Sequence, residues 1–160
     1  MANIFVSCPS SDLDLACEVM HACTDAGHVV TFDWVPFARQ ADTLTDAEVR
    51  SVAKMLYKGH RAADCILLVI PPSGPSFGCG VELGLAWGSG KPVFIAELGS
   101  DQHHPQWAIW MAHPFRVAHL QYCSSSLEGA LKRITEREYI SDWASSKSPQ
   151  PYLIPDHKHR

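Results

Sequence analysis

No apolar run in the 160 residues approaches the roughly 20 residues that a membrane-spanning helix requires. The first residues, MANIFVSCPSS, also lack the basic segment and the following apolar segment that mark a secretion signal. We therefore expect a cytoplasmic protein with no membrane partner.

Basic residues are fewer than acidic ones: the chain has 13 lysines and arginines against 17 aspartates and glutamates, and its formal net charge is -4. The lysines and arginines do not gather into a stripe along the sequence. A surface that binds a nucleic-acid duplex needs such a stripe, because its cations replace the counterions of the phosphates. We expect no nucleic-acid polymer as a partner.

The six cysteines form no CxxC pair. Most of them stand among apolar residues, and their spacing fits reduced, buried thiols better than a disulfide framework or a zinc site. We therefore expect neither a metal nor a cofactor. The cysteines are Cys8, Cys17, Cys23, Cys65, Cys79 and Cys123.

What is present is the composition of an ordinary globular domain, with 46% hydrophobic and 19% charged residues. The length suits one domain with a sizeable core, and we assign this domain to residues 1–142. Towards its end the chain becomes polar and rich in proline, so we expect an extended tail over residues 143–160.

Stretches typical of strands and of helices alternate along the chain. This alternation predicts right-handed crossovers and an α/β fold: a three-layer α/β/α sandwich with a five-stranded parallel sheet, Rossmann- or flavodoxin-like. The predicted strands are residues 3–8, 28–34, 65–71, 90–98 and 115–122. The predicted helices are residues 13–26, 82–89, 125–139 and one that a capping box opens at Thr45, with an apolar face of Val49, Val52, Ala53 and Leu56.

In a parallel sheet, ligands bind beyond the carboxyl ends of the strands. Three predicted loops lie there, residues 7–12, 33–37 and 71–82. In the third loop, Gly78 and Gly80 allow backbone N–H groups to approach an anion, and the Ser76 hydroxyl could bind the same anion. The loop is not a Walker loop, and a dinucleotide fingerprint would need glycine where Leu83 stands.

Glu82 follows this loop and admits two interpretations. In the first, it is a first-turn carboxylate that the helix dipole stabilises by about 0.3–1 kcal/mol. In the second, it is a nucleophile that attacks the anomeric carbon of a sugar and forms a glycosyl-enzyme. A carboxylate suits that chemistry, because the transition state carries oxocarbenium charge beside it. The residues by themselves leave both interpretations open.

The run from Ala63 to Ile95, ADCILLVIPPSGPSFGCGVELGLAWGSGKPVFI, resembles the core of the nucleoside 2-deoxyribosyltransferase superfamily. Within it, SFGCGVELG is especially similar to the 2'-deoxynucleoside 5'-phosphate N-hydrolase branch. The resemblance implies that Glu82 is the nucleophile and that Ser76 holds the 5'-phosphate. It also implies ligand contacts by Ser7 and Ser10 of the first loop, for which helix capping is the alternative.

The chain departs from the family pattern at one point. Family members generally carry a second carboxylate in the helix before the Ala-Asp pair, and this helix has no acid between Arg50 and Asp64. Asp64 itself is expected to cap or pack at the start of its strand. Asp33, or His60 if it faces the site, could donate a proton to the leaving base, provided that it reaches the base. Trp34 either lines the base side or closes the core.

The resemblance therefore implies an enzyme that cleaves the N-glycosidic bond of a (deoxy)nucleoside 5'-monophosphate through a covalent glycosyl-Glu82 intermediate and releases the free base. Two alternatives stay open: a transferase that exchanges bases, and a nucleotide-binding protein without catalysis. A TIR-like NAD glycohydrolase fits the motif spacing less well. Since family members are commonly oligomeric, we expect a homodimer or a larger homo-oligomer, with Trp107 and Trp110 in the segment where the contact would lie.

Overall fold

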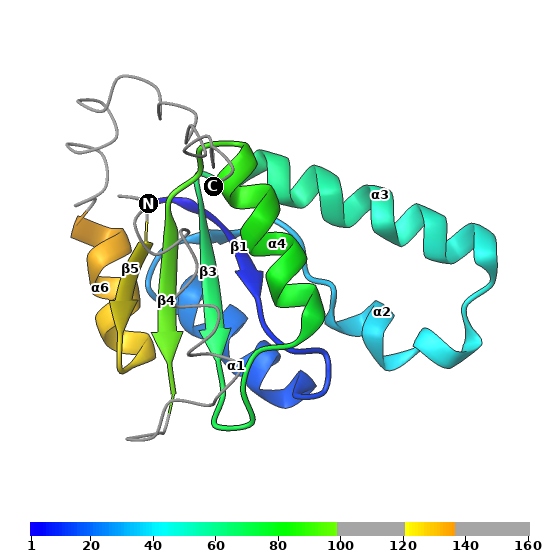
Figure 1. Ribbon diagram of the computed structural model, residues 1–160, viewed down its shortest axis with the longest axis horizontal. Helices are drawn as coiled ribbons and strands as arrows, with labels where there is room; N and C mark the ends of the chain where they lie inside the picture. Colours follow the sequence, from blue (N-terminus) through cyan, green and yellow to red (C-terminus); the bar gives the residue numbers. More distant parts are fainter. Residues whose placement is uncertain (99–120, 137–160) are drawn as a thin grey trace, which may run out of the picture.

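The computed structural model describes residues 1–98 and 121–136, which form an α/β fold around a parallel sheet (Figure 1). The strands are β1 (Asn3–Ser7), β2 (Val29–Val30), β3 (Cys65–Ile70), β4 (Val93–Glu97) and β5 (Gln121–Ser124), in the spatial order β2-β1-β3-β4-β5. The helices are α1 (Leu13–Asp25), α2 (Val35–Arg39), the 3-10 helix η1 (Ala41–Thr43), α3 (Asp46–Ala62), α4 (Phe77–Gly88) and α6 (Leu127–Glu136).

The α/β class and the parallel sheet agree with the prediction. This order of neighbouring strands is the one that flavodoxin-like folds share. The predicted strand 115–122 meets the described residues only at 121 and 122, where β5 begins. The predicted tail, 143–160, and the segment with Trp107 and Trp110 lie outside the described residues. None of the described helices is both long and apolar enough to span a membrane.

β2 is much shorter than the predicted strand 28–34. Its ladder with β1 ends where the Thr31 N–H and hydroxyl both donate to the Ile4 carbonyl. Further along, the indole N–H of Trp34 donates to the Val6 carbonyl at 3.0 Å, which draws the chain out of the sheet. The β-branched and aromatic residues therefore predicted the strand correctly but not the residue at which it ends.

Different helices cover the two faces of the sheet. On one face, α1 and α6 pack against Ile4 and Val6 of β1. On the other face, α4 packs against a cluster that includes Phe5. Side chains alternate along a strand, so neighbouring residues of β1 belong to different cores. All residues of β3 are buried, as the continuous apolar run CILLVI predicts for a strand that is covered on both faces.

Two residues of the family-like run fasten α3 to the amino ends of the strands. Asp64 accepts hydrogen bonds from the main-chain N–H of Asn3 at 2.8 Å and from its side-chain amide at 3.2 Å, as expected of a residue that packs at the strand's start. The Lys91 ammonium donates to the carbonyls of Arg61 and Ala63 at the end of α3, where carbonyls have no partner within the helix. Both residues therefore have structural partners far from the carboxyl ends of the strands.

One face of α3 carries a basic stripe that the linear sequence did not reveal. Helical spacing aligns Arg50, Lys54, Lys58 and Arg61, and all four are exposed. The last three line one hollow together with Tyr57, whose ring lies 5.9 Å below the Arg61 guanidinium. The expectation that lysines and arginines form no stripe is thus wrong for this helix, because the spacing of a helix gathers residues that look scattered along the chain.

His28 is a buried histidine that joins three parts of the fold. Its Nδ1 accepts from the N–H of Ala2 at 3.2 Å, and its Nε2 lies 3.1 Å from the hydroxyl of Thr135. That hydroxyl donates to the Leu131 carbonyl, so it can only accept from the imidazole, and the proton belongs on Nε2. The imidazole is therefore neutral. Burial, and then the charge of the N-terminus, lower its pKa.

We expect His28 to make the protein less stable in mild acid. Because its folded pKa lies below the ordinary 6.5, the unfolded chain binds the proton more readily, and stability is lost as the pH falls through 6.5 towards the folded pKa. Urea unfolding between pH 5 and pH 8 measures this. Relative to the parent, His28→Asn should lose stability as the pH rises from 5 to 8, whereas the control His21→Asn, on an exposed part of α1, should run parallel to the parent. Parallel curves for all three proteins would contradict the assignment.

Candidate functional site

α4 begins at Phe77, ahead of the Glu-Leu-Gly sequence where the helix was predicted to start. Ser76 stands directly before it, and its hydroxyl oxygen accepts from the Cys79 N–H at 3.3 Å, as an N-cap does. Gly78 and Gly80 therefore lie inside the helix and not in a loop. Glu82 lies beyond the first turn, so its interpretation as a first-turn partner of the helix dipole is wrong.

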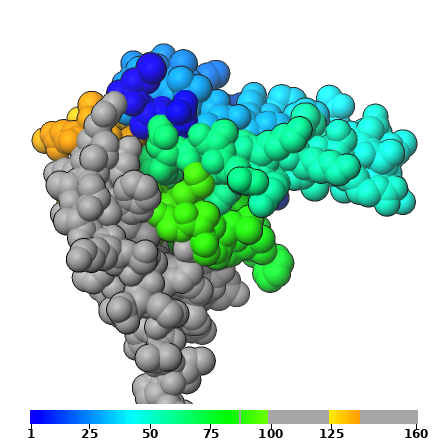
Figure 2. Space-filling model, turned by 90° about the horizontal axis from the view of Figure 1, so that it is seen from above, coloured from blue at the N-terminus to red at the C-terminus, as the bar shows by residue number. Residues whose placement is uncertain are grey.

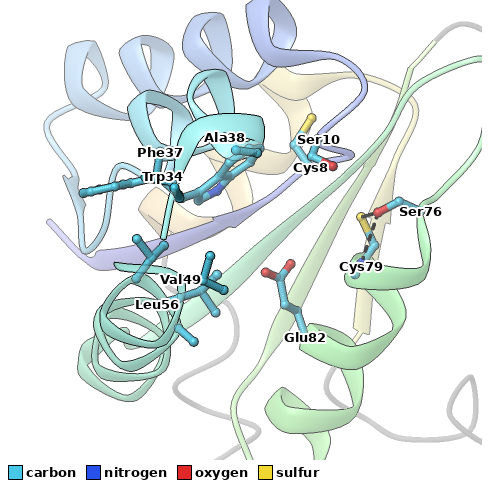
Figure 3. A pocket seen from close by; sticks show the side chains of 15 residues that line it. Cys8, Ser10, Trp34, Phe37, Ala38, Val49, Leu56, Ser76, Cys79 and Glu82 are labelled. Carbon is cyan, nitrogen blue, oxygen red and sulfur yellow. Dashed lines mark hydrogen bonds between the residues drawn. The ribbon is translucent and has the colours of Figure 1, made fainter. Parts of the chain in front are cut away.

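A cavity of about 380 Å³ opens at the carboxyl ends of the strands, with α4 on one side and α2, η1 and α3 on the other (Figure 3). Its volume is in the range of small-molecule sites. Its described lining consists of Cys8, Ser10, Trp34, Phe37, Ala38, Ala41, Leu44, Val49, Val52, Ala53, Leu56, Ser76, Gly78, Cys79 and Glu82.

The two sides of this cavity differ in chemistry. The side formed by α2, η1 and α3, which we call the apolar wall, contributes hydrocarbon and aromatic side chains. The opposite side carries hydroxyl, thiol and carboxyl groups, with Ser76, Cys79 and Glu82 all on or next to α4 (Figure 3). An arrangement of this kind can bury an apolar ring against one side and bind polar groups at the other.

Much of the apolar wall comes from the apolar face of α3, which in the sequence has the pattern of a face that packs in the core. α3 opens with the predicted capping box, in which the Thr45 N–H donates to the Glu48 carboxylate at 2.8 Å. The helix approaches the body of the protein near its other end, where a Cβ on Gly59 would lie 2.5 Å from the Cβ of Phe32. Its first half reaches outward with α2 as the cyan arm in Figure 2, which leaves Val49 and Val52 to line the cavity.

Glu82 is held at its side chain and at its main chain. The Ser7 hydroxyl donates to Oε2 of the carboxylate, and the His60 Nε2 lies 3.3 Å from the main-chain oxygen. Burial raises the pKa of Glu82 to about 7, although the hydrogen bond from Ser7 acts in the opposite direction. His60 itself is buried, with its ring edge-on to Phe5, so it does not line the cavity.

The serines of the first loop do not cap the next helix. Asp12 does so, by accepting from the Leu15 N–H at 3.3 Å. Ser10 lines the cavity, and Ser7 contacts Glu82. Helix capping, the alternative interpretation of both serines, is therefore not their role.

The remaining predicted residues divide between the cavity and its surroundings. Trp34 lines the cavity and also belongs to the core on the α1 side. Gly78 lines the cavity, whereas Gly80 does not. Asp33 is exposed and does not line the cavity, because its carboxylate accepts from the Val35 N–H in the turn that opens α2. The geometry therefore does not favour the acid role predicted for Asp33.

Two of the cysteines, Cys8 and Cys79, line the cavity together with Glu82, which their apolar neighbours in the sequence did not reveal. Burial raises the pKa of Cys8 to about 12, so its thiol is neutral. No group of three or more metal-binding side chains occurs within residues 1–98 and 121–136.

Comparison with protein families supplies an independent finding. The family model described as nucleoside 2-deoxyribosyltransferase matches residues 4–130 of the chain. This span runs from β1 into α6, so it includes Ser7, Ser76, Glu82 and the whole apolar wall. A comparison with curated proteins gave no match.

We expect Glu82→Gln to stabilise the protein at pH 8. The folded pKa of about 7 lies above the reference value of 4.5, so the carboxylate costs stability as the pH rises through this window. The variant should gain on the order of 1–3 kcal/mol at pH 8 and nothing at pH 4, measured by urea unfolding. Glu18→Gln, at an exposed position of α1, is the matched control and should be neutral. A variant less stable than the parent at pH 8 would contradict the raised pKa.

Proposed function

The chain belongs to the nucleoside 2-deoxyribosyltransferase family, and from this membership we propose that it cleaves the N-glycosidic bond of a (deoxy)nucleoside 5'-monophosphate and transfers the sugar to water. The family's chemistry is glycosyl transfer or hydrolysis at a nucleoside. The observation that carries the proposal is the Glu82 carboxylate, which is half-buried and oriented by Ser7 at a cavity with one apolar and one polar side.

The phosphate would bind at the start of α4. Helix N-termini bind anions, since their free N–H groups and the helix dipole favour negative charge. The Ser76 hydroxyl stands at this end, and Gly78 is exposed in the lining. Among the described residues, a Cβ on Gly78 would meet only the Ser76 hydroxyl, at an ordinary 3.6 Å, so their packing does not require glycine there. A ligand that closely approaches the backbone at this position would explain the glycine.

The base would lie against the apolar wall. A nucleotide whose phosphate sits at Ser76 and whose sugar lies over Glu82 has its base on the far side of the cavity, where Trp34 and Phe37 offer aromatic rings. Aromatic side chains suit the flat faces of bases. Water as the usual acceptor then requires only that the site stay open enough to admit it after the base departs.

The reaction would proceed by two displacements at the anomeric carbon. An oxygen of Glu82 attacks this carbon, the bond to the base nitrogen breaks with its electron pair on the base, and the base takes up one proton. Water then attacks the same carbon and loses a proton, the ester bond breaks, and the carboxylate is restored. The ionised carboxylate is required for the first step, so a pKa of about 7 makes the rate rise with pH through neutrality.

Base release from a panel of substrates tests the proposal. Nucleosides and nucleoside 5'-monophosphates, in ribo and deoxy forms, would be incubated with the protein and analysed by chromatography, alongside Glu82→Ala and Glu82→Gln. We expect release from monophosphates by the parent and a loss of about a thousandfold or more in both variants. Release only in the presence of an added free base would identify a base-exchanging transferase. Nucleotide binding without any release would identify a non-catalytic binding protein.

Two substitutions of Ser76 test the phosphate seat. Aspartate caps helices as well as serine does, so Ser76→Asp keeps α4 intact and adds negative charge where the phosphate would bind. We expect its kcat/KM to fall about tenfold or more for monophosphates and to change little for the matching nucleosides. Ser76→Ala, which removes the hydroxyl without adding charge, should fall between the parent and the aspartate variant. An equal loss for both substrate classes would place the phosphate elsewhere.

A further inference from the structure

The sequence assigned Ser7 to ligand binding, but its surroundings indicate a different task. Ser7 is the last residue of β1, and its main chain pairs with Leu68 of β3. Its side chain is on the same face of the strand as Phe5, towards α3 and α4, and the residue is 1% exposed. A side chain so enclosed contacts protein atoms on all sides.

The hydroxyl of Ser7 has one proton, and this proton is committed to the carboxylate of Glu82. The two residues are 75 positions apart in sequence, so the fold alone brings them together. Ser7 also does not belong to the described lining of the cavity. It therefore has no donor left for a substrate and no direct surface towards one.

Among the residues that the structure describes, the groups that face Glu82 supply no positive charge. They are the neutral thiol of Cys8 beyond β1, the thiol of Cys79 on α4 and the imidazole of His60 on α3. Burial lowers the pKa of His60, and its Nε2 proton is directed at a carbonyl, so the ring is neutral. Within the described lining there is no lysine or arginine. Among the interactions that Glu82 makes with described residues, the hydrogen bond from Ser7 is therefore the one that favours the ionised carboxylate.

We propose that Ser7 is a positioning residue for glycosyl transfer, which orients the Glu82 carboxylate towards the sugar and favours its ionised form, while His60 fixes the main chain of the same residue. This rests on the proposed function insofar as it concerns turnover. The Ser7–Glu82 coupling itself is a property of the free protein. Rigid partners of this kind set the orientation of a nucleophile within narrow limits.

Removing the Ser7 hydroxyl should shift the pH profile of kcat. In Ser7→Ala the ionised carboxylate loses a charge-assisted hydrogen bond, so the pKa of Glu82 rises further and the acidic limb of kcat shifts to higher pH by about one unit or more. At pH 6.5 kcat should fall about tenfold, with most of it recovered at pH 9. Ser7→Thr keeps the hydroxyl and should restore the parent profile. His60→Phe keeps a ring against Phe5 but removes the N–H, and should lower kcat without moving the limb.

A second readout does not depend on turnover. Protein labelled with ¹³C at the glutamate carboxyl carbon would be titrated by NMR, with Glu82→Gln to assign the signal. We expect the Glu82 midpoint near 7 in the parent, higher in Ser7→Ala and restored in Ser7→Thr. Ser89→Ala is the matched control, because this exposed hydroxyl bonds only carbonyls at the far end of α4. Should Ser7→Ala fail to fold, Ser7→Cys replaces it, since a thiol has nearly the same shape and is a weak donor.

The outcomes separate the two proposals. An unchanged NMR midpoint in a folded Ser7→Ala protein overturns the positioning role, whatever the activity. A raised KM with an unshifted profile also overturns it and restores Ser7 as a substrate contact. A shifted midpoint in a protein that releases no base from any substrate supports the coupling and removes only the proposed function.

Discussion

The burial of one carboxylate is the constraint on which the rest of the site depends. Glu82 is half-buried, which disfavours its charge, and its pKa rises to about 7. Strongly shifted pKa values of this kind cluster at functional sites. Here β1 supplies the hydroxyl of Ser7 and α3 supplies the imidazole of His60. Two elements thus converge on one residue of α4, β1 at its side chain and α3 at its main chain.

The two ends of the sheet have different tasks. At the amino ends of β1 and β3, Asp64 and Lys91 fix the neighbouring main chain through hydrogen bonds that involve no ligand. At the carboxyl ends the same strands lead into the segments that form the cavity. The family-like run therefore combines residues that fasten the main chain with residues that line the cavity. Because the same strands run from one end of the sheet to the other, fixing their amino ends also helps to fix the positions of the cavity residues at their carboxyl ends.

The cavity depends on a helix that leaves the body of the protein. Tight packing at Gly59 holds the last part of α3, while its first part reaches outward beside α2 (Figure 1). Hydrophobic side chains on that outer part would be costly to expose without a partner. Facing a cavity, they provide an apolar wall that, in the proposed function, would hold the base while the α4 start holds the phosphate.

The sequence by itself determined the fold class and the buried strands and singled out Glu82 as a candidate, because local periodicity and a compact motif carry that information. It misplaced the start of α4, because glycines at 78 and 80 disfavour a helix that the Ser76 cap and burial of Cys79 nevertheless secure. It also assigned Asp33 to the site, whereas the Asp33 carboxylate accepts from the Val35 N–H in a turn outside the cavity. Only the tertiary structure brought Ser7 to Glu82 and turned α3 towards the cavity, since contacts between distant segments leave no periodic trace in a chain.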